Sequence, residues 1–345
     1  MKGLFKTAAG PGNMEIRETQ IPKPGPGQVL IQIKSAGICG SDLHIYHWAI
    51  AYKMNPPMII GHEFSGVIVE CGKDVEGWEK GARVTAEPSA IICGKCHYCR
   101  TGAYNLCDER RVMGYWVNGV FAEYVAADAQ RLHRLPDSAS FDEGALAEPL
   151  ACCVHGVHEL TGVEAGDFVA ITGPGAIGLL CAQLAKAEGA TVAIIGTGVD
   201  KARLAAAGKL GADHCINLEE TDPVKAVREL TDGYGADIVL ECSGAGAAAA
   251  TGLELARKQG KYTQIGLFGK PVTLDFERIA YKELKVTGTI SQRWTAWKRT
   301  MKLMEQGKLN LKEIISGKYP LTEWKTAFEK FEAKEGLKIL LDPAR

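Results

Sequence analysis

The sequence predicts an α/β protein with two domains, one β-rich and one built on a doubly wound parallel sheet. The chain of 345 residues is longer than a typical single domain. Before about residue 150, short apolar runs such as residues 29–33 are separated by Pro and Gly clusters, which is typical of β-structure. After residue 152, apolar strands alternate with helical patterns, which predicts parallel strands with helices on both faces.

The elements of the second region follow in a regular order. Strands are predicted at residues 168–172, 191–195, 237–242 and 261–267. Helices are predicted at residues 176–188 and 200–210, and a third begins at the Ala-rich residues 245–250. The tail carries amphipathic helices at residues 296–306 and 322–334, followed by a strand at residues 337–341.

Composition argues against nucleic acid and membranes as partners. The net charge of −1 gives no bulk attraction to a polyanion or an anionic membrane. No apolar stretch approaches the roughly 20 residues of a membrane helix, and the N-terminal segment lacks the apolar core of a signal peptide. Eleven cysteines without a secretion signal indicate a reducing compartment, so we expect a cytoplasmic protein.

Four cysteines form a compact metal-binding pattern. Cys93, Cys96, Cys99 and Cys107 have the spacing C-x2-C-x2-C-x7-C, in which thiolates of one loop can surround a tetrahedral ion. Four sulfur ligands leave no open position for a substrate, so the ion is expected to be a structural zinc. An iron–sulfur cluster is the main alternative, because it also uses four cysteines.

A second set of ligands is spread along the chain. Cys39, His62 and Glu148 each lie beside Gly or Pro, and Glu63 directly follows His62. A thiolate, an imidazole and a carboxylate suit a catalytic zinc, which keeps one exchangeable position for substrate. Taken one at a time, these residues prove little, because a lone cysteine is usually a core residue and a lone glutamate is usually solvated.

A glycine-rich turn predicts a dinucleotide site of the Rossmann type. Gly173, Gly175 and Gly178 form G-x-G-x-x-G after a predicted strand and, with Ala176 and Ile177, open a predicted helix. The first glycine permits the tight turn, the second allows the backbone to approach the pyrophosphate, and the third packs helix on strand. The N–H groups at the helix start are expected to bind the phosphates.

The segment after the second strand bears on the choice between NAD(H) and NADP(H). Enzymes selective for NAD usually place an acid here, and its position corresponds to Gly198. Asp200 is the nearest carboxylate on this loop, whereas Lys201 and Arg203 could accept a 2′-phosphate. These signals conflict, and the sequence favours NAD by a small margin.

The segments GICGSDLH and GHEFSGVIVECG, at residues 37–44 and 61–72, together with the cysteine quartet resemble the zinc-containing medium-chain dehydrogenase/reductase family. The resemblance runs along essentially the whole chain. Glu148-Pro149 and the tail around Trp297 are more similar to the polyol (sorbitol-like) and threonine dehydrogenase branches than to the ethanol branch, which has a cysteine in place of Glu148.

The resemblance implies a domain division and a location for the active site. Residues 1–150 and 290–345 should form a GroES-like catalytic domain with one structural and one catalytic zinc. Residues 151–289 should form the Rossmann domain, with the active site in the cleft between the domains.

The resemblance also implies a role for each candidate residue. It assigns Cys39 and His62 as zinc ligands, and it implies Glu63 and Glu148 as further ligands or as partners of the zinc-bound water. Asp42 would orient the ligand histidine. Ser41 and His44 would carry the alcohol proton to solvent after zinc has lowered the alcohol pKa, while hydride passes to the nicotinamide.

The leading hypothesis is therefore an oxidoreductase acting on a secondary alcohol such as a polyol, sugar alcohol or cyclitol, with an alcohol/ketone pair as its small-molecule partner. The alternatives are an enzyme like L-threonine 3-dehydrogenase and a non-catalytic, zinc-stabilised relative. We expect a homodimer or homotetramer. Six loop residues could contact substrate or could simply pack: Ile45, Tyr46, Tyr115, Trp116, Phe121 and Arg293.

Overall fold

The computed structural model describes residues 1–49 and 54–345, and the chain divides into two compact units. The first unit comprises Met1–Ala151, Arg293–Gly307 and Ile315–Arg345, and the second comprises Cys152–Gln292 and Lys308–Ile314. One segment differs from the sequence-based division, because Lys308–Ile314 groups with the second unit. The Asn310 backbone N–H donates to Oε1 of Gln183 at 2.7 Å, which ties this segment to a helix of that unit.

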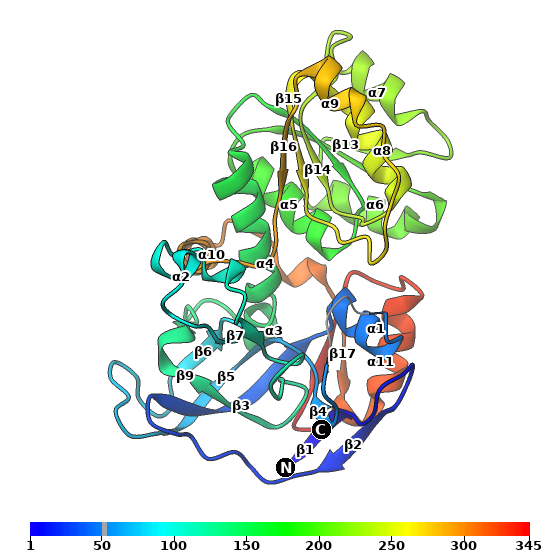
Figure 1. Cartoon of the computed structure of the whole chain (residues 1–345). Helices are drawn as coiled ribbons and strands as arrows, with labels where there is room; N and C mark the ends of the chain where they lie inside the picture. Colours follow the sequence, from blue (N-terminus) through cyan, green and yellow to red (C-terminus); the bar gives the residue numbers. More distant parts are fainter. Residues whose placement is uncertain (50–53) are drawn as a thin grey trace. The chain divides into compact units, whose positions relative to one another are not determined.

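The first unit is built on a mostly antiparallel sheet whose strands come from both the early part and the end of the chain (Figure 1). The order of the main sheet is β10-β6-β5-β3-β18-β17, and β9 also pairs with β3. Its strands are β3 (Gln28–Gly37), β5 (Glu63–Cys71), β6 (Arg83–Ala86), β9 (Tyr124–Asp128), β10 (Leu132–Arg134), β17 (Ile315–Pro320) and β18 (Lys338–Asp342). The last two strands therefore belong to the first unit, because β18, near the end of the sequence, pairs with β3, near its start.

Smaller elements surround this sheet. The other strands are β1 (Lys2–Lys6), β2 (Met14–Glu18) and β4 (Met58–Ile59) in one sheet, and β7 (Ser89–Ile91) with β8 (Arg111–Val112) in another. The helices are α1 (Gly40–Tyr46), α2 (His97–Arg100), η1 (Tyr104–Leu106), η2 (Ala129–Arg131), α3 (Phe141–Gly144), α4 (Ala147–Val154), α10 (Trp294–Glu305), η6 (Leu321–Glu323) and α11 (Trp324–Glu332). Alternate residues of β3 and β5 supply a core that includes Ile31, Ile33 and Phe64.

The second unit contains the predicted doubly wound parallel sheet. Its strand order is β13-β12-β11-β14-β15-β16, and all five pairings are parallel. The strands are β11 (Phe168–Thr172), β12 (Thr191–Gly196), β13 (His214–Asn217), β14 (Ala236–Glu241), β15 (Ala256–Gln264) and β16 (Lys285–Gly288). The chain reverses its direction across the sheet between β11 and β14, and the carboxyl ends of such strands are where doubly wound sheets bind ligands.

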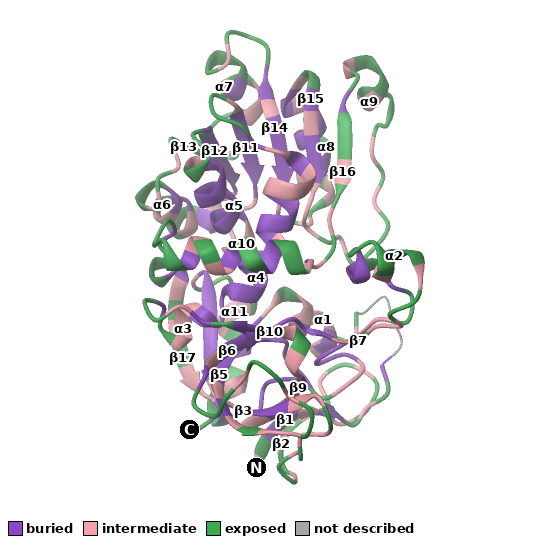
Figure 2. Ribbon diagram, turned by 90° about the vertical axis from the view of Figure 1, so that its left-hand side faces the viewer, coloured by how far each residue is buried: buried purple, intermediate pink, exposed green. Residues whose placement is uncertain are grey.

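Helices connect the strands of this sheet. They are α5 (Ala176–Ala187), η4 (Gly198–Asp200), α6 (Lys201–Lys209), α7 (Pro223–Glu229), α8 (Gly246–Leu255) and α9 (Glu277–Lys282). The π-helical η3 (His155–Thr161) precedes the sheet, and η5 (Lys312–Ile314) follows it in the segment that returns to this unit. Because α5 and α8 join strands that step in opposite directions, right-handed crossovers place them on opposite faces. The central strands are consequently buried along nearly their whole length (Figure 2).

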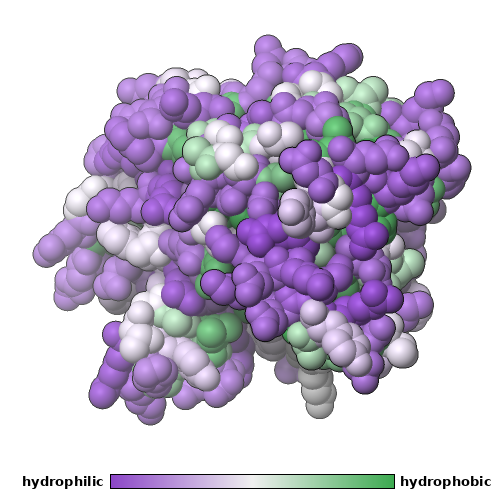
Figure 3. All heavy atoms as spheres, turned by 90° about the horizontal axis from the view of Figure 1, so that it is seen from above, coloured by the Kyte–Doolittle hydropathy of each residue, from purple (hydrophilic) through white to green (hydrophobic). Residues whose placement is uncertain are grey.

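The surface visible in Figure 3 is mostly hydrophilic, with apolar atoms in small separate areas. In residues 1–49 and 54–345, no helix combines the length and the apolar character needed to cross a bilayer.

Candidate metal centres and dinucleotide-binding turn

The antiparallel pairing of β3 with β5 brings the first set of candidate ligands together. Gly37, the last residue of β3, lies opposite Glu63, the first residue of β5. Cys39 follows β3 as the residue before α1, and His62 precedes β5. Consequently the sulfur of Cys39, a ring nitrogen of His62 and a carboxylate oxygen of Glu63 all lie within 4.8 Å of one another.

Glycine at position 37 is needed for this close approach. A β-carbon on Gly37 would lie 3.0 Å from Cε of Lys338 and closer still to the carboxylate of Glu63. The absence of a side chain therefore leaves room for both charged groups beside the ligand set.

Asp42 lies beside two of the candidate ligands. Its Oδ2 accepts a hydrogen bond from the Cys39 backbone N–H at 2.9 Å, closing a capping box at the start of α1. Its Oδ1 lies 3.7 Å from Nδ1 of His62. Burial raises the pKa of Asp42 to about 6, whereas the His62 imidazole and the Cys39 N–H favour the ionised carboxylate. With Nδ1 facing Asp42, the Nε2 atom of His62 is left to face a metal.

Lys338 is a buried cation that the sequence analysis missed. Its ammonium forms an ion pair with Oε2 of Glu63 and donates to the Ile38 carbonyl at 2.8 Å. Burial alone would lower the pKa of Lys338, but attraction to Glu63 and Cys39 outweighs this and raises it above its usual value. The available signal was a lysine in the otherwise apolar segment Leu337–Leu341, since an unpaired charge in a buried strand is costly.

The remaining predicted residues of this centre lie nearby but outside the three-residue set. Glu148, near the start of α4, is buried and close enough to exert a charge effect on His62 and Lys338. Ser41 and His44 are one turn apart on α1. The Ser41 hydroxyl is buried and, within the described residues, has no hydrogen-bond partner, so the relay pair is not joined in this structure.

The cysteine quartet forms a second, separate cluster. One sulfur from each of Cys93, Cys96, Cys99 and Cys107 lies within 4.8 Å of the others. Backbone N–H groups point at these sulfurs: Cys96 donates to Cys93 at 3.3 Å and Cys99 donates to Cys96 at 3.4 Å. The N–H groups of Lys95 and Cys96 lower the pKa of Cys93 to about 7, which favours the thiolate that a metal requires.

A buried polar network anchors the quartet loop to the main sheet. Tyr104, located between the third and fourth cysteines, donates to Oε2 of Glu87 at 2.6 Å. The other carboxylate oxygen of Glu87 lies 3.2 Å from Nε2 of His133, whose ring stacks on Trp297 at 4.8 Å. Sequence reasoning did not single out Glu87, because an isolated glutamate in a loop gives no sign of burial.

The glycine-rich turn has the geometry of a phosphate cradle. Gly173 follows β11 with a φ of +95°, and a β-carbon there would lie 2.7 Å from Cβ of Ser243. A β-carbon on Gly178 would clash with the Gly173 carbonyl, so this glycine lets α5 approach the turn. Gly175 precedes α5 and faces open space, where no side chain caps the helix. The N–H groups of Ala176 and Ile177 are at that helix start, available to an anion.

The loop after β12 contains Gly198 and Asp200, the two residues expected to bear on the choice of cofactor. Asp200 is buried, and its Oδ2 accepts from the backbone N–H of Thr197 at 3.1 Å and from its hydroxyl at 2.8 Å. Its Oδ1 lies 3.6 Å from Nη1 of Arg203. The Asp200 carboxylate thus caps its own turn. Gly198 lies under the carboxylate of Glu219, a residue that the sequence analysis did not consider.

The six possible substrate contacts have different environments. Ile45 and Phe121 are fully buried in the core of the first unit. The Tyr46 ring packs edge-on against Trp324 and Phe328. Tyr115 lies with its ring 5.3 Å from that of His62, which makes it the best placed of the six. Trp116 lies under Arg111, and Arg293 precedes α10.

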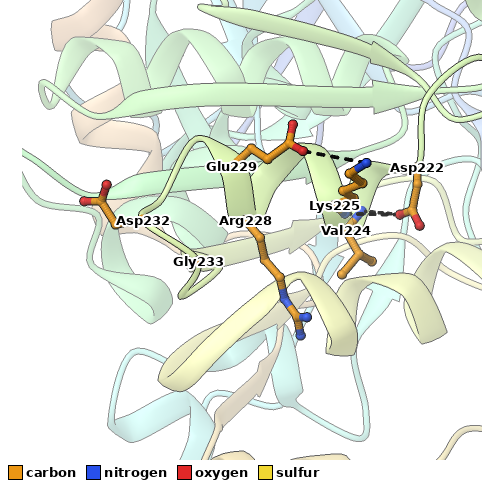
Figure 4. Close-up of a pocket in the computed structure, with 7 residues that line it drawn as sticks. All are labelled: Asp222, Val224, Lys225, Arg228, Glu229, Asp232 and Gly233. Carbon is orange, nitrogen blue, oxygen red and sulfur yellow. Dashed lines mark hydrogen bonds and ion pairs between the residues drawn. The ribbon is translucent and has the colours of Figure 1, made fainter.

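A hollow of about 560 Å³ lies beside α7 in the second unit (Figure 4). It is lined by Asp222, Val224, Lys225, Arg228, Glu229, Asp232 and Gly233. Asp222 caps α7, and Lys225 lies 3.9 Å from Glu229, so these charges serve the helix itself. None of the predicted metal or cofactor residues lines this hollow.

Comparison with known proteins finds related dehydrogenases along nearly the whole chain. Residues 25–137 match the family described as alcohol dehydrogenase GroES-like domain, and residues 176–306 match the family described as zinc-binding dehydrogenase. A sorbitol dehydrogenase of Halalkalibacterium halodurans is 45% identical over 99% of both chains. An L-threonine 3-dehydrogenase of Pyrococcus horikoshii is 41% identical over 99% of this chain and 98% of its own.

A solved structure of a related protein has the same fold. A zinc-binding dehydrogenase of Sinorhizobium meliloti, described as bound to NADP, superposes with a TM-score of 0.92 at 33% identity over 99% of both chains.

Proposed function

The chain belongs to the zinc-containing medium-chain dehydrogenase/reductase family, and from this premise we propose that it oxidises a secondary alcohol of the polyol class with NAD as hydride acceptor. The observation that carries the proposal is the set of the partly buried Cys39 and the buried His62 and Glu63, whose ligand atoms lie within 4.8 Å of one another. Three protein ligands leave an open position on zinc, as catalytic zinc sites require.

The donors in this set fit a cation. Within the described residues, Oε1 of Glu63 is buried without a hydrogen bond, while Oε2 faces the Lys338 ammonium. A buried carboxylate without hydrogen bonds is costly unless an ion compensates for it. The cysteine quartet, by contrast, has four ligands and no open position, so we assign it a structural zinc.

Zinc at Cys39 and His62 would polarise the substrate hydroxyl and ease the loss of its proton. Asp42 would hold the His62 ring in the orientation that presents Nε2. The Ser41 hydroxyl would accept the substrate proton at Oγ and pass it to His44, one turn along α1 and partly exposed. Glu148 is buried close to His62 and would be available as a further ligand.

The glycine-rich turn is the proposed site of the cofactor pyrophosphate. Its open helix start at Gly175 supports phosphate binding. We propose NAD, and not NADP, as the preferred cofactor, in line with the expectation from the sequence. A homodimer or homotetramer is proposed as well: β16 is the outer strand of its sheet and exposes Val286, which suits pairing with a second copy. Sedimentation measurements would test the oligomeric state.

A substrate panel tests the proposed activity. Purified protein with measured zinc content is incubated with NAD⁺ and either polyols, cyclitols or L-threonine, and cofactor reduction is followed at 340 nm. We expect turnover of a polyol and two zinc ions per chain. Turnover of L-threonine alone would select the alternative function, whereas no turnover of any secondary alcohol by zinc-loaded protein would refute both.

A further inference from the structure

Resting on the proposed function, we infer that Glu219 is the residue that selects NAD over NADP. Glu219 follows β13, one strand further along the sheet than the loop where the selective acid of dinucleotide-binding folds usually lies. The loop after β12 has Gly198 at that position instead, and the Glu219 carboxylate lies directly over it.

The Glu219 carboxylate occupies the space that a side chain at position 198 would fill. A β-carbon built on Gly198 would lie 3.0 Å from Cδ of Glu219 and closer still to its Oε2. Gly198 does not have the positive φ that requires glycine, and the three atoms nearest to that β-carbon position all belong to the Glu219 carboxylate. The backbone would accept another residue at position 198, so what its lack of a side chain provides is room for Glu219.

Backbone contacts fix where Glu219 leaves the sheet. The N–H of Leu218 donates to the Gly196 carbonyl at 2.9 Å, which joins the ends of β12 and β13. The N–H of Glu219 itself donates to Oδ1 of Asn217 at 3.1 Å. The turn therefore directs the side chain back toward the loop at Gly198.

The Glu219 carboxylate is also uncommitted. The residue is exposed, and in residues 1–49 and 54–345 its side chain has neither a hydrogen bond nor an ion pair. Asp200 differs in both respects, because it is buried and caps Thr197. Of these two acids, Glu219 is the one free to accept hydrogen bonds from the adenosine ribose.

The charges nearby agree with selection against NADP. Arg203 lies 3.6 Å from Asp200, so the cation that could attract a 2′-phosphate is already facing a carboxylate. Lys201 is exposed on the same loop and adds one positive charge. A 2′-phosphate would have to displace the Glu219 carboxylate or lie against it, whereas a 2′-hydroxyl would donate to it.

Binding measured by calorimetry tests this assignment without relying on turnover. The zinc-loaded wild type, Glu219→Gln and the matched control Glu220→Gln are titrated with NAD⁺ and with NADP⁺. Glu220 is the next residue and accepts from Asn217 at 2.8 Å, so its removal changes the local charge equally but leaves Gly198 covered. We expect Glu219→Gln to shift the ratio of the two Kd values toward NADP⁺ by about tenfold, or about 1.4 kcal/mol, and Glu220→Gln to shift it less than threefold.

A rescue variant makes the test sharper. In Gly198→Asp/Glu219→Gln the acid returns to the loop after β12, and we expect the preference for NAD⁺ to return as well. A wild type that binds NAD⁺ and a Glu219→Gln variant with an unchanged ratio would overturn the inference while leaving the proposed function intact. A zinc-loaded wild type that binds neither nucleotide would instead refute the proposed function, and the inference with it.

Discussion

The two groups of candidate metal ligands differ in how much of the chain each needs. The quartet takes all four sulfurs from one segment between Cys93 and Cys107, and three of the four thiols are only partly buried. The open set joins Cys39 with His62 and Glu63, and its buried countercharge, Lys338, comes from the far end of the chain. A closed site can thus be formed locally, whereas an open site depends on the tertiary structure that buries it.

Replacing a quartet cysteine should have the largest effect, and on stability. Binding of structural zinc contributes about 10–16 kcal/mol in isolated zinc-finger peptides. We therefore expect Cys96→Ser to lower the Tm by about 10 °C or more and to remove one zinc. Thermal unfolding and metal analysis measure this, with the exposed Cys215→Ser as a control. A variant as stable as the control would show that the quartet has no structural role.

Cys39→Ser should act on turnover instead. Loss of this ligand should reduce kcat/KM by about a thousandfold or more, equivalent to about 4 kcal/mol, with little change in Tm. The control is Cys71→Ser, a partly buried cysteine outside both clusters. If Cys39→Ser lowered the Tm as much as Cys96→Ser does, the two sites would not differ in role as proposed.

Lys338→Met tests the countercharge of the open set. It leaves Glu63 buried and unpaired, and breaking such a pair costs about 3–5 kcal/mol. We expect that loss in urea unfolding of the metal-free protein, and a smaller one after zinc is added. Adding Glu63→Gln should restore most of the stability.

Lys318→Met is the matched control. Lys318 lies on the neighbouring strand, is partly exposed and pairs with Asp142 at 2.7 Å, so its loss should cost about 1 kcal/mol or less. Equal losses for the two lysines would argue against a buried pair.

Asp42→Asn should have the smallest effect. It keeps the size of the side chain but weakens the orientation of His62, so zinc affinity at the open set should fall by about 10- to 100-fold. Competition with a chelator of known affinity measures this, and zinc in the quartet serves as the internal reference. Unchanged affinity would mean that Asp42 serves only as the cap of α1.

The features that could be predicted from the sequence are those formed within one short segment. The quartet and the glycine-rich turn each lie within about 15 residues, so their spacing alone carried the information. The central strands were also predicted, because strands buried on both faces are continuous apolar runs. The pairing of Lys338 with Glu63 could not be predicted, since nothing local links β18 to β5.

Contacts between neighbouring strands were also missed, as the loops after β12 and β13 show. Asp200 and Glu219 are both acids near the end of a strand, and the sequence pointed to the first. The structure shows that Asp200 caps its own turn while Glu219 covers Gly198. A hydrogen bond within one turn and a contact between neighbouring strands leave no distinguishing pattern in a single sequence.

The late position of β18 also bears on how the protein acquires metal as it is made. The quartet is complete once Cys107 has left the ribosome, whereas Lys338 is added more than 200 residues later. At ordinary rates of synthesis this delay is roughly ten seconds or more. We therefore expect the nascent chain to bind its first zinc at the quartet. The open set should bind zinc only after the chain has left the ribosome, when the strand carrying Lys338 has paired with β3.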